Sequence, residues 1–144
     1  MSEHNERWTL NRLIEICLDG ERGFRHAANH VHNTTVKTLF LDIAVQRQRF
    51  AAELLPHAQR LGGPAESDGS LAGGLHRGWM TIKDAVAHDE SAIIHEAERG
   101  ERAALAAFED GLNGVMAPGT RAVVERQCST IRDSCNLVHA LSNC

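Results

Sequence analysis

The chain has 144 residues and a formal net charge of −4 at pH 7, a size expected for one domain covering residues 1–144. Its 42% hydrophobic and 24% charged residues are typical of globular domains and exclude a chain that is disordered throughout. The sequence has no apolar run near the ~18 residues of a membrane span, and its start, MSEHNERWTL, lacks the apolar core of a signal peptide. We therefore expect a cytoplasmic protein that has neither a nucleic acid nor a membrane as its partner.

The spacing of the apolar residues predicts an all-α fold. Tyr is absent, the other aromatic residues are few, and residues that favour helices are abundant. Clusters of Gly, Pro, Asn and Asp separate segments in which apolar residues recur every three or four positions. The predicted helices cover residues 9–31, 35–61, 71–87, 90–112 and 120–142. The expected N-caps, whose side-chain oxygens accept hydrogen bonds from a first turn, are Thr34 or Thr35, Ser70, Asp89 and Thr120.

The connections between these segments predict how the helices are arranged. The first two long helices are joined by a tight turn, and so are the last two, so each pair is expected to form an antiparallel hairpin. The Gly- and Pro-containing stretch after the second helix, together with the short helix at 71–87, then connects the first hairpin to the second. This connectivity predicts a ferritin-like four-helix bundle with a short fifth helix in its crossover.

Each long helix has a polar residue within or beside its apolar stripe. Glu21 interrupts the stripe of the first helix and Glu101 that of the helix at 90–112, while Gln46 and Gln127 have similar places in the other two. The tetrapeptides Asp-Gly-Glu-Arg and Arg-Gly-Glu-Arg around the two glutamates form a faint internal repeat. A repeated hairpin with two equivalent inward carboxylates is the pattern expected of a pseudo-twofold metal site.

A metal centre is one interpretation of these interior carboxylates. Di-iron bundles take one Glu from each of two helices and a Glu-x-x-His motif from each of the other two. The chain supplies the first half, but in the other two helices it has Gln46-x-x-Arg49 and Glu125-x-x-Cys128. The metal hypothesis therefore names iron or manganese as the ion. Its candidate ligands are Glu21, Glu101, Glu125, Glu53 and His57.

The residues favour a second interpretation, in which protein groups or water hold the carboxylates. An arginine at a ligand position repels a metal ion and neutralises a nearby Glu, whose burial alone would be costly. Arg49 is the arginine at a ligand position, and the groups that could hold the carboxylates are Arg47, Arg49, Gln46, Gln127 or water. Gln46, Gln127 and Arg49 form the predicted interior polar layer.

A third hypothesis concerns soft metal ions. Cys128, Cys135 and His139 are spaced by seven and four residues on one helix, a pattern that suits Cu(I) or Zn(II). Cysteines at helix-core positions are, however, ordinarily small buried hydrophobes. The chain contains no Cys-x-x-Cys pair that would strengthen the metal interpretation.

Five stretches together resemble a known family: LNRLIEICLDGERGFRHAANHV, LFLDIAVQRQRFAAELLPHAQRLGG, GSLAGGLHRGWMTIK, EAERGERAALAAFEDGL and VVERQCSTIRDSC. They are similar to the bacterial ferritin-like family catalogued as domain of unknown function 2383. The resemblance implies a ferritin-like bundle and brings no established activity. The wider ferritin-like group binds iron or manganese for oxidation or storage, so the resemblance implies Glu21 and Glu101 as matching ligand positions.

The preferred prediction is a stress-related or interaction protein, rather than an enzyme, with a degenerate or absent di-metal site and no certain cofactor. The alternatives are an iron or manganese carboxylate oxidoreductase or storage protein, and a Cys/His bundle that binds copper or zinc. Self-association through an outer helix face is a further expectation, with Trp79 and Met80 as candidate contact residues. The sequence identifies no other protein partner.

Overall fold

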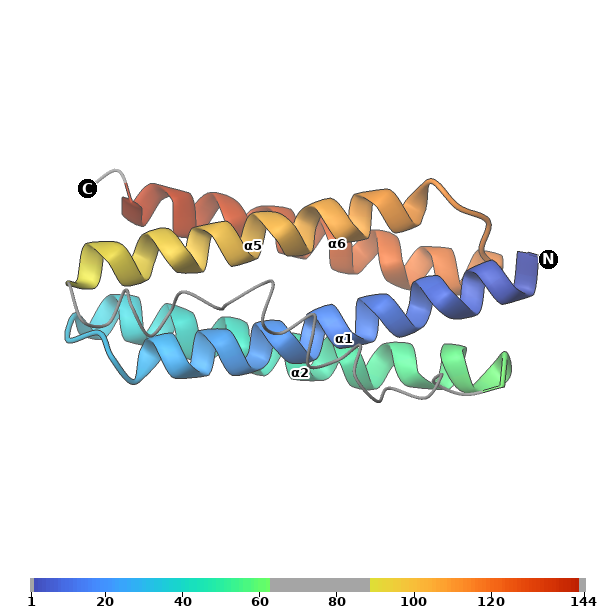
Figure 1. Ribbon diagram of the computed structural model, residues 1–144, viewed down its shortest axis with the longest axis horizontal. Coiled ribbons are helices and arrows are strands. Elements are labelled where there is room, and N and C mark those ends of the chain that lie inside the picture. The colour runs from blue at the N-terminus through green and yellow to red at the C-terminus, as the bar shows by residue number, and fades with distance from the viewer. Residues whose placement is uncertain (1, 63–88, 143–144) are drawn as a thin grey trace.

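The computed structural model describes residues 2–62 and 89–142, and this part of the chain contains four helices and no strand (Figure 1). The helices are α1 (Ser2–Ala28), α2 (Thr34–Arg60), α5 (Glu90–Leu112) and α6 (Pro118–Ser142). The prediction of an all-α bundle with four long helices is therefore confirmed for the described residues. The predicted short helix at 71–87 lies outside them, as do Ser70, Trp79 and Met80.

The helices form two antiparallel hairpins that pack side by side (Figure 1). α1 packs on α2 and α5 on α6, and the hairpins meet through the pairs α1–α5 and α2–α6, so α2 and α5 occupy opposite corners of the bundle. The start of α5 lies beside the α1–α2 turn, because Glu90 accepts a hydrogen bond of 2.5 Å from the backbone N–H of His32. The end of α2 lies at the opposite end of the bundle, beside the start of α1 (Figure 1).

Capping side chains set the starts of two helices. Asn33 caps α2, where Thr34 or Thr35 was expected, because its Oδ1 accepts the N–H three residues ahead at 3.0 Å. Asp89 caps α5 as predicted, with the equivalent hydrogen bond at 2.9 Å. Thr120 lies inside α6 because that helix begins earlier, at a proline, whose missing N–H costs nothing in a first turn.

α1 is shifted toward the N-terminus relative to its predicted range, since it begins at Ser2 and ends at Ala28. Its first turns have no apolar stripe, so periodicity did not reveal them. They are held instead by Glu6, which is buried and accepts hydrogen bonds from Arg60 at 2.9 Å and from the backbone N–H of Ala117 at 3.1 Å. This one carboxylate joins the ends of α1, α2 and α6.

The core consists of two apolar clusters separated by a polar layer at mid-length. One cluster contains Phe50, Phe108 and Ile131, and the other contains Phe24 and Phe40. On α2 and α5 the positions between the clusters include Arg47 and Glu101, both of which are buried. The described residues include no helix that is long and apolar enough to cross a membrane.

Candidate functional site

The polar layer is built around one fully buried ion pair. Arg47 is 1% exposed and Glu101 is 0% exposed. The guanidinium donates two parallel hydrogen bonds to the carboxylate, Nη1 to Oε1 and Nη2 to Oε2, each of 2.6 Å. Its Nε donates a third, of 3.2 Å, to the side-chain oxygen of Gln46. Bidentate contacts of this kind are short and strongly directional, so they fix both side chains in one geometry.

The pair spans the interior of the bundle diagonally. Arg47 is on α2 and Glu101 is on α5, at opposite corners, so the long arginine side chain crosses between the other two helices. Gly20 of α1 faces it, because a Cβ built at Gly20 would lie 3.4 Å from Arg47 Cγ. This distance is an ordinary van der Waals contact, so α1 packs directly against the arginine stem at Gly20.

Charge and burial act against each other at this pair. Burial alone would lower the pKa of Arg47, but the charge of Glu101 and the hydrogen bonds to it raise that pKa. The guanidinium therefore stays protonated. Breaking such a buried pair costs about 3–5 kcal/mol because one charge is left without compensation, so Arg47 and Glu101 depend on each other.

Two cysteines lie close to the ion pair and remain neutral thiols. Burial raises the pKa of Cys17 to about 12, although the positive charge of Arg47 acts in the opposite direction. Burial and the charge of Glu101 also raise the pKa of Cys135. Because the thiolate is the form that binds metals and acts as a nucleophile, neither cysteine is activated at neutral pH.

Glu21, the predicted equivalent of Glu101, lies at the edge of the interior. Its side chain is 19% exposed, and its Oε2 accepts a hydrogen bond of 3.0 Å from Arg25 one turn later. The buried face of α1 contains Leu10, Leu13, Cys17 and Phe24, whereas Ile14 and Leu18 are only partly buried. Glu21 lies on the same side of the helix as Ile14 and Leu18, at the edge of the interior, so it does not share the position of Glu101.

The other candidate ligands have separate partners. Glu125 is exposed on α6. Glu53 is exposed and accepts hydrogen bonds from Arg126 at 2.7 Å and from Gln127 at 2.9 Å, and Nδ1 of His57 lies 2.8 Å from Thr120 Oγ1. In residues 2–62 and 89–142, no three His, Cys, Asp or Glu side chains form a group that could hold a metal ion.

The predicted interior polar layer is only partly correct. Gln46 is half-buried and contacts Arg47, as described above. Gln127 is fully buried, and its Nε2 donates to the Phe50 carbonyl at 3.3 Å and to Glu53, while its Oε1 has no hydrogen-bond partner among the described residues. Arg49 is exposed, so its prediction as an interior residue is wrong.

The soft-metal candidates are divided between the core and the surface. Cys128 and Cys135 are buried, whereas the side chain of His139 is 48% exposed. Nδ1 of His139 lies 2.5 Å from a carboxylate oxygen of Glu98. Burial also raises the pKa of Cys128, so the two thiols resist ionisation.

The Glu98 network is the polar site that the sequence pattern missed. Glu98 is buried and accepts hydrogen bonds from Arg102 at 2.6 Å and from Ser142 at 2.9 Å, besides its contact with His139. Burial would raise the pKa of Glu98, but these hydrogen bonds outweigh it and lower the pKa to about 2. The one signal in the sequence is the i, i+4 spacing of Glu98 and Arg102.

The donor set at the centre of the bundle does not fit a di-iron or di-manganese centre. Among the described residues only the Glu101 carboxylate is fully buried, and both of its oxygens are engaged by a guanidinium. The second expected carboxylate, Glu21, is at the edge and pairs with Arg25. A carboxylate metal site in a bundle needs several inward-facing Glu and His groups, whereas the central layer of the described residues offers Glu101 paired with the Arg47 guanidinium.

Fold and site together define an antiparallel helical bundle whose interior carboxylate is neutralised by a buried arginine. The chain belongs to the family described as a domain of unknown function, DUF2383, whose model matches residues 6–114. The resemblance seen in the sequence is thereby confirmed for the family. The match includes Arg47 and Glu101 but ends before α6. No curated protein matches the chain.

Proposed function

We propose that this protein is a ferritin-like bundle that acts as an interaction protein, and that the Arg47–Glu101 ion pair takes the place of a metal centre. The observation that carries the proposal is the bidentate contact between these side chains, with both distances at 2.6 Å and both groups buried. A metal ion at the Glu101 carboxylate would have to displace the guanidinium and lie beside its positive charge.

The ferritin-like part of the proposal is supported by the ends of the hairpins. The end of α2 and the start of α5 lie at opposite ends of the bundle, as expected where one long crossover joins two antiparallel hairpins (Figure 1). The proposal includes the predicted crossover with its short helix at residues 71–87.

The chemistry of the pair supports a structural role for the centre. An arginine does not release its proton at physiological pH, so the pair supplies neither a general base nor a proton carrier. Its fixed geometry instead sets the register of α2 against α5, which are diagonal to each other. The function then belongs to the outer faces of the bundle, where this protein would meet its partner.

Elemental analysis tests the proposal on full-length protein purified without a histidine tag and incubated with Fe(II), Mn(II) or Zn(II). After desalting, we expect far less than one equivalent of metal per chain, both in the native protein and in the matched variants Glu101→Gln and Glu21→Gln. Retention of about two equivalents of iron or manganese, lost in Glu101→Gln, would contradict the proposal and support a carboxylate metal centre.

A further inference from the structure

The outer face of α2 carries a short pattern of opposite charges around an apolar residue. Asp42, Val45 and Arg49 are spaced by three and four residues, which places them along one side of the helix. All three are exposed, and the 38% exposure of Val45 makes it one of the few large apolar side chains that the described core leaves uncovered.

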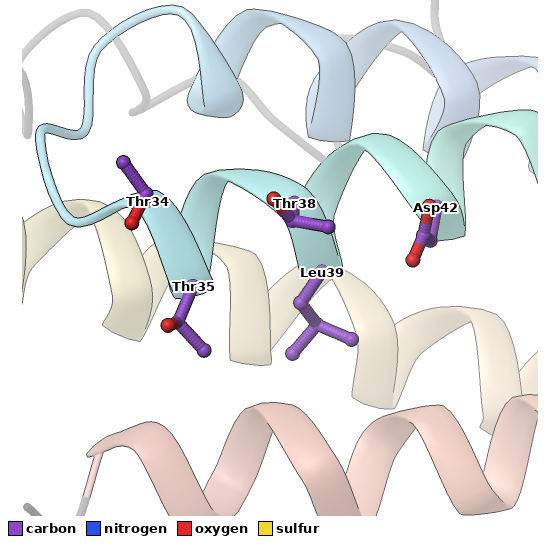
Figure 2. A pocket seen from close by; sticks show the side chains of 5 residues that line it. All are labelled: Thr34, Thr35, Thr38, Leu39 and Asp42. Atoms are coloured by element: carbon purple, nitrogen blue, oxygen red, sulfur yellow. The ribbon is translucent and has the colours of Figure 1, made fainter.

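Two shallow, open hollows lie along this side of α2. The first hollow, of about 390 Å³, is lined by Thr34, Thr35, Thr38, Leu39 and Asp42. Figure 2 shows these side chains following one another along the helix, with Thr35 and Leu39 directed toward α6. The second hollow, of about 510 Å³, begins at the same Asp42 and continues past Val45 and Arg49 to Arg126 of α6.

Of the four charged residues that line the second hollow, Asp42 and Arg49 have no partner among the described residues. Glu53 and Arg126, which also line the second hollow, neutralise each other at 2.7 Å. Asp42 and Arg49 make no hydrogen bond or ion pair with the described residues. They are two helical turns apart, with ~10.5 Å between their Cα atoms, and no ion pair joins them.

We propose that this face of α2 is the docking surface for a second copy of the chain, in an antiparallel, two-fold symmetric arrangement. In an isologous contact each patch meets its own copy, so a residue on one chain faces its counterpart reciprocally. With the axis near Val45, Asp42 of each chain faces Arg49 of the other. The pattern negative–apolar–positive is thus complementary to itself, and two ion pairs flank a contact between the valines.

This inference rests on the proposed role as an interaction protein and names the partner. The α2 helix has 27 residues and is therefore ~40 Å long, enough for an extended helix–helix contact. The hollows on either side of Asp42 offer space for the side chains of the second chain. The interior ion pair has no part in this contact, so an experiment can refute the proposed replacement of the metal centre without refuting the proposed dimer, and the reverse.

Charge swaps test the arrangement by sedimentation equilibrium on the full-length protein. We expect the native chain to form a dimer. Asp42→Arg or Arg49→Asp alone should raise the dissociation constant of the dimer at least tenfold, because each substitution places two pairs of like charges opposite each other. The double variant Asp42→Arg/Arg49→Asp exchanges the charges and should restore the dimer. Glu125→Arg is the matched control, since it makes the same charge change at an exposed position of α6 and should leave dimerisation unchanged.

Three results would overturn the proposal: a native chain that stays monomeric across the concentration series, single variants that dimerise as the native chain does, or a folded double variant that does not recover. Circular dichroism establishes that each variant is folded. Metal retention in the elemental analysis alongside an intact, charge-dependent dimer would refute the proposed replacement of the metal centre while leaving this interface in place.

Discussion

Removing the charge of Arg47 provides a quantitative test of the interior ion pair. In Arg47→Met the side chain keeps much of its length, but Glu101 is left 0% exposed without its counter-charge. Breaking one partner of a buried pair costs about 3–5 kcal/mol of the free energy of unfolding. The pair is well formed, with two hydrogen bonds of 2.6 Å, so we expect Arg47→Met to lower the free energy of unfolding by at least about 3 kcal/mol.

The double variant should behave in the opposite way. Arg47→Met/Glu101→Leu leaves no charge at the centre of the polar layer, and replacing a whole buried pair by apolar residues of similar volume is often neutral or stabilising by about 1–4 kcal/mol. The double variant should therefore be more stable than either single variant by about 3 kcal/mol or more. Such strong non-additivity is expected only for residues in direct contact.

Urea denaturation followed by circular dichroism measures these differences through the free energy of unfolding extrapolated to water. Arg22→Met is the matched control, because Arg22 is exposed and the same substitution there should change stability by no more than about 0.5 kcal/mol. A structural role for the buried ion pair is refuted if Arg47→Met lowers the free energy of unfolding no more than the control does, or if the losses of the two single variants simply add in the double variant.

Two further predictions concern Glu98 and Cys17. Because the pKa of Glu98 is lowered from 4.5 to about 2, its contribution to stability is present above pH 4.5 and is lost as the pH falls toward 2. Over this pH range the free energy of unfolding of Glu98→Gln should fall by about 1 kcal/mol less than that of the native protein, a value reduced because the groups around Glu98 are exposed. An unchanged dependence of stability on pH would contradict the Glu98 network. Because burial raises the pKa of Cys17 to about 12, iodoacetamide at pH 8 should alkylate it only in unfolded protein. Peptide mapping by mass spectrometry checks this, and rapid alkylation in the native state would show that the layer is open to solvent.

The helices could largely be predicted because periodicity and capping are local properties. Asp89 caps α5 as expected, and the predicted range of that helix, 90–112, agrees with Glu90–Leu112. The start of α1 could not be found in this way, since its first turns are polar. They are held by the contact between Glu6 and Arg60, which are distant in sequence.

The candidate site was predicted in part. The apolar stripe of α5 predicted Glu101 inside the bundle, and Glu101 is fully buried. Glu21 was misplaced because α1 has two overlapping apolar stripes, and local spacing does not decide which of them faces the core. Arg47 was named as one of several groups that could hold a carboxylate, but an arginine is ordinarily expected at the surface. Only the diagonal packing of α2 and α5 selects it.

In the proposed arrangement, the Arg47 guanidinium lies where a metal ion would contact Glu101. Nuclear magnetic resonance of arginine side chains, with Mn(II) added, tests it at that position, because a bound paramagnetic ion broadens the resonances of nearby groups. We predict that the Arg47 guanidinium gives slowly exchanging signals that depend on Glu101 and keep their widths when Mn(II) is added. Selective broadening of Arg47 relative to the exposed Arg22, saturating at a stoichiometric amount of Mn(II), would show that a metal ion binds beside Glu101 and would refute the proposed replacement.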